Sequence, residues 1–218
     1  MAAPAAATIS VRDTLAMLDN PKREVADGVC NDQYIFWLGS GISRDRMPDL
    51  RDVAKRVLTG LQSLIEQANP DCRFRRALNA VLSLANPSAD EWGRIDFSSS
   101  PESWLDFDMF ALRLVNNYSR MLNVPVDGEE PDYILWNILD AANVYADATI
   151  EPDAEHLCLA ALAIEGVASE MPTANWDCLI ERATRLLAGS QPILRVIVGS
   201  HNVRGNRLRG NLYKFHGC

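Results

Sequence analysis

The chain has 218 residues, 48% of them hydrophobic, with a formal net charge of -8 and a pI near 4.9. This composition is that of a folded domain rather than of a disordered chain. The acidic balance argues against direct binding of nucleic acid or of an anionic membrane over the whole surface, and no apolar run approaches the roughly 20 residues that a membrane helix needs.

The ends and the cysteines indicate an ordinary intracellular domain. The opening MAAPAAATIS lacks the basic start and strong hydrophobic core of a signal peptide. The five cysteines are scattered and form no CxxC pair, so we expect no zinc knuckle among them. They fit small buried hydrophobic residues in a reducing compartment, and a cytoplasmic location is expected.

The first predicted elements are a helix, a strand and a second helix. Apolar residues share one helical face over residues 8–27. The aromatic and β-branched run at 33–38 indicates a buried strand, which ends at the glycines of residues 39–41. Apolar spacing is again helical over residues 49–68, so the order is strand, glycine turn, helix.

The middle of the chain is predicted to be mostly helical, with two polar, proline-bearing interruptions at 86–102 and 123–132. The expected helices are 72–85, 104–122, 133–148 and 155–170. Beyond them the pattern predicts a short strand at 171–174, a helix at 176–187 and strands at 192–198 and 211–215.

Strands that alternate with helices predict an α/β fold: a Rossmann-like parallel sheet with helices on both faces, and a helical insertion at about 70–170. Such sheets bind ligands at the carboxyl ends of their strands. Three short motifs fall at predicted strand ends, namely GSGIS, TANWD and FHG. Their shared placement is stronger evidence than any one of them.

The first motif is a glycine turn. Gly39 and Gly41 allow close approach of a ligand and positive φ, and amides of the turn and of the following helix suit a pyrophosphate. The full GxGxxG fingerprint is absent because Arg44 stands where its third glycine belongs. A plain strand-to-helix turn is the alternative interpretation.

The other two motifs carry polar side chains suited to catalysis. Asn175 and Asp177 follow a predicted strand, although either could instead cap the next helix. His216 ends a strand beside a glycine and titrates near neutral pH, so it could accept a proton. His156 lies in a helical stretch and His201 in a polar loop, and neither is given a role.

Together these motifs resemble the sirtuin family. GSGISRDRMPDLRD is similar to the sirtuin cofactor loop, a GAGxS element followed by an IPDFR-like element, with Leu50 in place of the phenylalanine. TANWDCLIE resembles the TQNIDxL segment, and more closely the TxNYDxLIE form of divergent bacterial sirtuin-like proteins. KFHG resembles the K-(I/L)-HG segment with the family's catalytic histidine.

The resemblance implies the site. Asn175 and His216 would be catalytic, Asn175 by placing the nicotinamide ribose and a water molecule. The residues implied to bind NAD are Gly39, Ser40, Gly41, Ile42, Ser43, Arg51 and Asp177. NAD would be a substrate, and no metal is expected.

The resemblance also implies the activity. The long helical block and the motif spellings favour the bacterial NAD hydrolases of anti-phage defence, which act as homo-oligomers or with a sensor or partner domain. An NAD-dependent protein deacylase is the alternative, and a non-catalytic NAD- or ADP-ribose-binding module is a third possibility. Further strands follow the HG in this family, so residues 1–218 correspond to the N-terminal part of such a domain.

Overall fold

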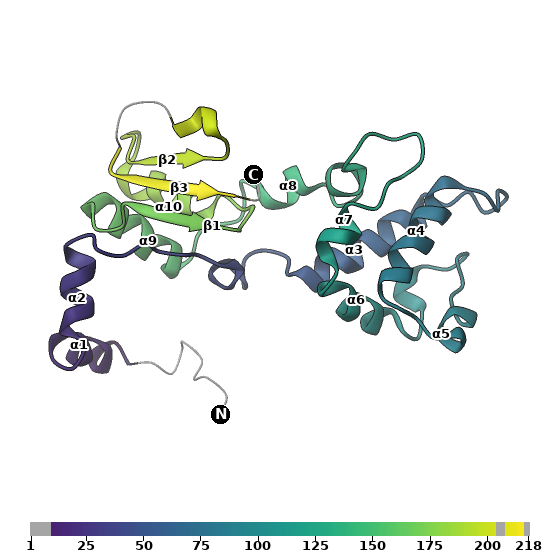
Figure 1. Ribbon diagram of the computed structural model, residues 1–218, viewed down its shortest axis with the longest axis horizontal. Helices are drawn as coiled ribbons and strands as arrows, with labels where there is room; N and C mark the ends of the chain where they lie inside the picture. Colours follow the sequence, from purple (N-terminus) through teal and green to yellow (C-terminus); the bar gives the residue numbers. More distant parts are fainter. Residues whose placement is uncertain (1–9, 204–207, 216–218) are drawn as a thin grey trace. The chain divides into compact units, whose positions relative to one another are not determined.

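A computed structural model describes residues 10–203 and 208–215. The chain divides into two compact units (Figure 1). We call Met1–Ser43 together with Ile150–Cys218 the sheet unit, and Arg44–Thr149 the helical unit. The helical unit therefore begins and ends earlier in the chain than the expected insertion at about 70–170, and the helix predicted at 155–170 belongs with the sheet.

The sheet has three parallel strands, β1 (Glu170–Thr173), β2 (Leu194–Ile197) and β3 (Gly210–Lys214). Their order is β1-β3-β2, with β3 in the centre (Figure 1). All three were predicted from the β-branched and apolar runs in the last third of the chain. Because the strands are parallel, their carboxyl ends lie at one edge, where ligands bind in folds of this class.

The segment at 33–38 was predicted to be a buried strand, and this was wrong. It runs beside β1, with Phe36 N and Leu38 N donating to carbonyls of β1, but only Leu38 forms a bridge, to Thr173. Ile35 and Trp37 are 68% and 72% exposed, whereas Leu38 packs into the core. An edge segment with one side in solvent can carry the same run of apolar and aromatic residues as a strand buried on both faces, so the run alone does not tell the two apart.

One face of the sheet carries the core of this unit. Strand β3 alternates buried and half-buried residues, and Leu212 packs with Met171 of β1. Helices α9 (Ala154–Glu165) and α10 (Leu179–Ala188) both contribute to this cluster. The described residues therefore show one helix-covered face, and a second helical layer remains a prediction.

The N-terminal helix expected at 8–27 is two helices, α1 (Val11–Asp19) and α2 (Arg23–Cys30). Pro21 stands in the break, where its ring and missing amide hydrogen prevent a continuous helix. Ser10 caps α1 by accepting from the Asp13 amide at 3.4 Å.

The helical unit contains the predicted middle helices in shorter pieces. Its helices are α3 (Leu50–Ser63), α4 (Arg73–Leu84), α5 (Ala89–Gly93), α6 (Phe107–Val115), α7 (Tyr118–Leu122) and α8 (Ala141–Tyr145), with a π-helical turn at Ile134–Ile138 and 3-10 turns such as Pro101–Ser103. The helix expected at 104–122 breaks at Asn116–Asn117, and the one expected at 133–148 breaks at Asp140, whose φ is 54°.

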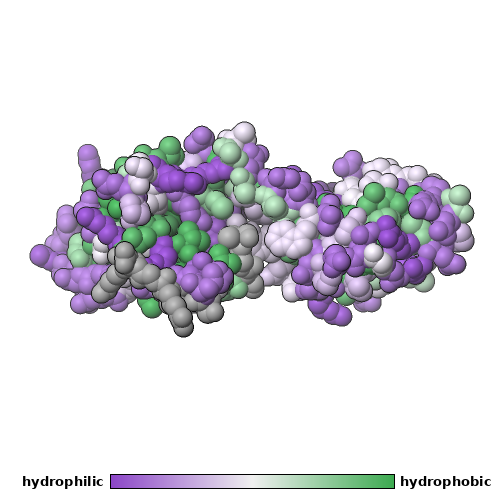
Figure 2. Space-filling model, turned by 90° about the horizontal axis from the view of Figure 1, so that it is seen from above, coloured by the Kyte–Doolittle hydropathy of each residue, from purple (hydrophilic) through white to green (hydrophobic). Residues whose placement is uncertain are grey.

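Most described cysteines are not buried, contrary to expectation. Cys72 is buried, Cys178 is half-buried, and Cys30 and Cys158 are exposed; none of these four forms a disulfide bond. Much of the surface seen in Figure 2 is hydrophilic, with apolar residues in separate patches. Among the described residues, no helix combines the length and the apolar character required to cross a membrane.

An ion pair inside the helical unit gives a pH-dependent prediction. Arg113 donates to both carboxylate oxygens of Glu91 at 3.1 and 2.9 Å, and this lowers the Glu91 pKa from 4.5 to about 2. A depressed carboxyl pKa stabilises the fold fully above the unfolded value, and the contribution is lost as the pH falls toward 2.

We therefore expect Glu91→Gln to lower the melting temperature by a few degrees at pH 7 and by progressively less between pH 4.5 and 2. Thermal unfolding followed by circular dichroism at stepped pH measures this difference. A melting-temperature difference that stays constant from pH 7 to pH 3 would contradict it.

Candidate functional site

Asn175 lies two residues beyond β1, at the carboxyl edge of the sheet, and its side chain is anchored by two acceptors. Its Nδ2 atom is 3.4 Å from the Gly39 carbonyl oxygen and 3.3 Å from Ser43 Oγ. Its backbone amide donates to Thr173 Oγ1 at 3.0 Å. TANWD and GSGIS, more than 130 residues apart in the sequence, thus meet directly.

These contacts fix which way the Asn175 amide faces. A carbonyl oxygen has no hydrogen to give, so only the NH₂ end of Asn175 can face the Gly39 carbonyl. The Oδ1 atom of Asn175 is buried and has no hydrogen-bond partner among the described residues. A buried carbonyl left unpaired costs about 1–3 kcal/mol, which a ligand hydroxyl or a water molecule could recover by donating to it.

Ser43 continues the network to a histidine that the sequence analysis gave no role. Ser43 ends the 3-10 turn Ser40–Ser43 and is 3% exposed. Its Oγ lies 3.1 Å from His156 Nε2, and His156 Nδ1 lies 2.5 Å from Asp153 Oδ1. His156 is in the first turn of α9 and is fully buried, and Asp153 caps that helix.

The proton positions in this network follow from its end groups. An ionised Asp153 only accepts, so His156 Nδ1 carries the hydrogen, and in the neutral imidazole Nε2 then accepts from the Ser43 hydroxyl. The Ser43 oxygen is then oriented to accept from Asn175. Burial alone would raise the pKa of Asp153, but the hydrogen bonds from His156 outweigh it and lower that pKa.

The atom order of Ser43, His156 and Asp153 is that of a hydrolase triad. Ser43, however, is 3% exposed and accepts a hydrogen bond from Asn175, so its oxygen is enclosed rather than presented to a substrate. We therefore interpret the network as the device that orients Asn175. One signal in the sequence pointed to it: Asp153 precedes His156 by three residues, the spacing of a helix cap and the group it supports.

The glycine turn lies beside Asn175. A Cβ built on Gly39 or on Gly41 would meet no atom within 4 Å, so this backbone has open space in front of it. Neither glycine has positive φ, so close approach rather than unusual backbone geometry is what glycine permits here. Ser40 is exposed, and Ile42 is half-buried against the core of the sheet.

The helix expected to follow this turn belongs to the other compact unit, and its N-terminus is already capped. Helix α3 belongs to the helical unit, and Asp49 caps it by accepting from the amides of Arg51 and Asp52 at 2.8 and 2.9 Å. A carboxylate already occupies the position where an anion would bind. Arg51 belongs to the same helical unit, and its side chain pairs there with Asp108 at 3.0 Å.

Asp177 is 6% exposed and precedes Cys178, the N-cap of α10, so it is not itself the cap that was weighed for it. Its Oδ1 accepts from the Leu179 amide at 3.1 Å, at the start of α10. Asn175 does not cap that helix, because its side chain reaches Gly39 and Ser43 instead. The remaining predicted residue, His216, lies outside the described residues.

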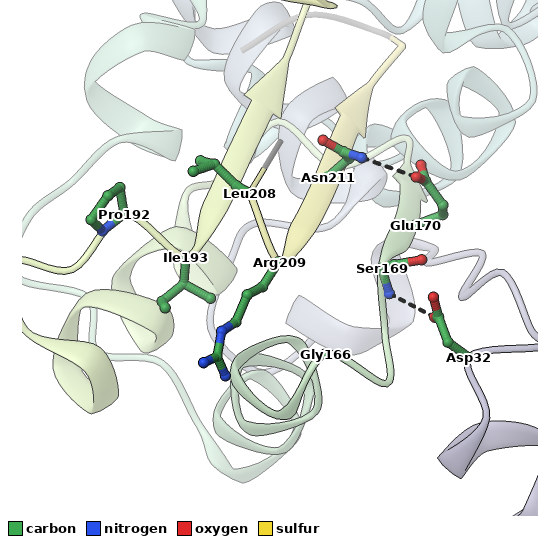
Figure 3. Close-up of a pocket in the computed structure, with 9 residues that line it drawn as sticks. All are labelled: Asp32, Gly166, Ser169, Glu170, Pro192, Ile193, Leu208, Arg209 and Asn211. Atoms are coloured by element: carbon green, nitrogen blue, oxygen red, sulfur yellow. Dashed lines mark hydrogen bonds between the residues drawn. The ribbon is translucent and has the colours of Figure 1, made fainter. Parts of the chain in front are cut away.

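A separate shallow pocket of about 480 Å³ lies at the opposite ends of the strands (Figure 3). Its polar groups bond one another: Asn211 donates to Glu170 at 2.9 Å, and the Ser169 amide donates to Asp32 at 3.0 Å. The buried side-chain atoms without a partner among the described residues lie elsewhere. Within the same residues, no group of three or more His, Cys, Asp or Glu side chains is placed to hold a metal ion.

Comparisons with protein-family models, with curated proteins and with solved structures returned no match to this chain.

Proposed function

We propose that this chain is a sirtuin-like NAD hydrolase with a Rossmann-like sheet, which cleaves NAD to nicotinamide and ADP-ribose. One observation carries the proposal: a buried asparagine whose NH₂ group is anchored and whose Oδ1 has no partner among the described residues, at the carboxyl edge of a parallel sheet beside open glycine backbone. That edge is where α/β sheets bind their ligands. The motif resemblance supplies the identity of the ligand, NAD.

The chemistry suits an amide carbonyl. Breaking the bond between ribose and nicotinamide builds positive charge on the anomeric carbon and ring oxygen, and the negative end of the Asn175 carbonyl dipole opposes it without reorganising. The same oxygen accepts a hydrogen bond from the attacking water or a ribose hydroxyl. Water oxygen bonds to the anomeric carbon, nicotinamide leaves with the bonding electron pair, and His216 accepts the released proton.

The network behind Asn175 provides preorganisation. Ser43, His156 and Asp153 hold the amide before substrate arrives, which avoids an ordering step during the reaction. The backbone of Gly39, Ser40 and Gly41 would accept the pyrophosphate, and Asp177 the nicotinamide amide. We also propose that Arg51 binds phosphate. This role rests on the motif resemblance alone, because the partner observed for the Arg51 side chain is Asp108.

We assign the hydrolase to anti-phage defence in the bacterial cytoplasm, where it depletes NAD as a homo-oligomer or with a sensor partner. In cells, infection should then lower total NAD when the wild-type chain and its partners are expressed, and should not when Asn175→Ala is expressed instead.

The direct test is nicotinamide release from NAD, with and without an acylated peptide. The proposal expects peptide-independent release with stoichiometric ADP-ribose, or its cyclised form. Release that requires the peptide would identify a deacylase. Tight NAD or ADP-ribose binding with no release, in the full assembly at saturating NAD, would identify a binding module.

A further inference from the structure

Lys214 is a buried cation at the same edge of the sheet. It is the last residue of β3, and its side chain is 1% exposed. The alternation of β3 turns it toward the face on which Leu212 packs. An ammonium group removed from water is strongly unfavourable unless oppositely charged or hydrogen-bonding groups surround it, so its partners indicate its purpose.

Three groups close to its Nζ belong to the segment that follows Asn175. Lys214 Nζ lies 2.8 Å from Glu181 Oε1, in the first turn of α10, and donates to the Asp177 carbonyl oxygen at 2.6 Å. The Cys178 sulfur is 3.8 Å from the same nitrogen. One cation therefore joins the end of β3 to the turn between β1 and α10.

Asp177 is held from both sides by this arrangement. Lys214 Nζ donates to the backbone carbonyl of Asp177, and the side-chain carboxylate of Asp177 accepts from the Leu179 amide. Asn175 stands two residues earlier in the same turn, so the path of that turn sets where its amide lies. Strand β3 also leads along the chain into His216, two residues after Lys214.

We propose that Lys214 is a positioning residue, which through Asp177 and Glu181 fixes the turn bearing Asn175 against the strand that leads to His216. Its consequence for turnover rests on the proposed NAD hydrolysis. A misplacement of about 1 Å between reacting groups can cost roughly 100-fold in rate, so a clamp at this point acts on kcat.

The test separates positioning from simple stabilisation. Lys214→Met alone leaves the Glu181 carboxylate buried without its cation, and we expect it to lower the melting temperature. In the double variant Lys214→Met/Glu181→Met an apolar pair replaces the ion pair, and stability should recover. The expected kcat for nicotinamide release stays roughly 10- to 100-fold below wild type in both variants, with a smaller change in KM.

A matched control is the Arg113–Glu91 pair of the helical unit, whose glutamate side chain is 11% exposed against 15% for Glu181. Arg113→Met and Arg113→Met/Glu91→Met should change stability and leave kcat within about twofold of wild type. Recovery of wild-type kcat together with stability in Lys214→Met/Glu181→Met would overturn the proposal, because the ion pair would then serve folding alone.

A second measurement does not depend on activity. Amide hydrogen exchange at Leu179, whose N–H bonds to Asp177, should be faster in Lys214→Met/Glu181→Met than in wild type. If wild type releases no nicotinamide, the proposed hydrolase fails and this exchange alone decides the role of Lys214. Equal exchange in the two proteins would overturn it.

Discussion

Asn175→Ala is expected to reduce nicotinamide release from NAD roughly 100- to 1,000-fold, the usual cost of removing one preorganised polar group that stabilises transition-state charge. The substitution removes the Oδ1, which has no partner among the described residues and would face the developing positive charge. It also removes the Nδ2 donor to Gly39 and Ser43, so we expect stability to change by no more than about 1–2 kcal/mol. Rates at saturating NAD and thermal unfolding measure the two effects.

Asn175→Asp tests whether the orientation of the Asn175 amide matters for activity. The aspartate has nearly the same shape, but an oxygen now faces the Gly39 carbonyl, and the two acceptors repel one another. Activity should therefore fall as far as in Asn175→Ala, because the group loses its orientation as well as its neutrality.

Asn211→Ala is the matched control. Asn211 lies in the same sheet, bonds Glu170, and lines the pocket at the other ends of the strands. Its substitution should leave the rate within about twofold of wild type. A folded Asn175→Ala protein with more than about a tenth of wild-type activity would contradict the proposed role of Asn175.

His156→Phe is expected to have the second largest effect, on both stability and rate. His156 is fully buried, and phenylalanine fills similar space while removing the bonds to Ser43 and Asp153. The Asp153 carboxylate loses its buried donor, and we expect a loss of about 1–3 kcal/mol in the free energy of unfolding. The freed Ser43 hydroxyl no longer orients Asn175, so nicotinamide release should fall roughly tenfold or more.

A double-mutant cycle with Ser43→Ala tests the connection. If the two residues act through one network, the losses of activity in Ser43→Ala and His156→Phe should be strongly non-additive. His201→Phe, at an exposed histidine, should leave stability and rate unchanged. Strictly additive losses in rate would show that His156 does not act through Ser43.

The strands of the last third were predictable from short-range pattern. Residues 192–198 and 211–215 are apolar and β-branched runs between turn residues, and they form β2 and β3 in a parallel sheet. The segment at 33–38 has the same composition but lies beside β1 with alternate side chains in solvent. The residue composition of a segment predicts that its backbone is extended. It does not predict whether other elements of the fold cover both of its faces.

In the candidate site, too, the features set by short-range pattern were predictable and the long-range contacts were not. GSGIS and TANWD were identified as neighbours of strand ends, and the structure joins them through Asn175, Gly39 and Ser43. His156 was overlooked because a histidine within a helical pattern shows no sign of its partner. That partner, Ser43, is 113 residues away in the chain.

The sequence by itself determined the α/β alternation, the positions of β1, β2 and β3, and the polar residues that follow strand ends, because each depends on local periodicity and turn chemistry. Tertiary structure decided what depends on long-range packing. It separated α3 and Arg51 into another unit from the glycine turn, placed His156 behind Ser43, and set Lys214 on the turn that holds Asn175. A buried polar group needs a hydrogen-bond partner, and that partner can come from any part of the chain that the fold brings close. The residues next to the group in the sequence therefore do not identify a distant partner.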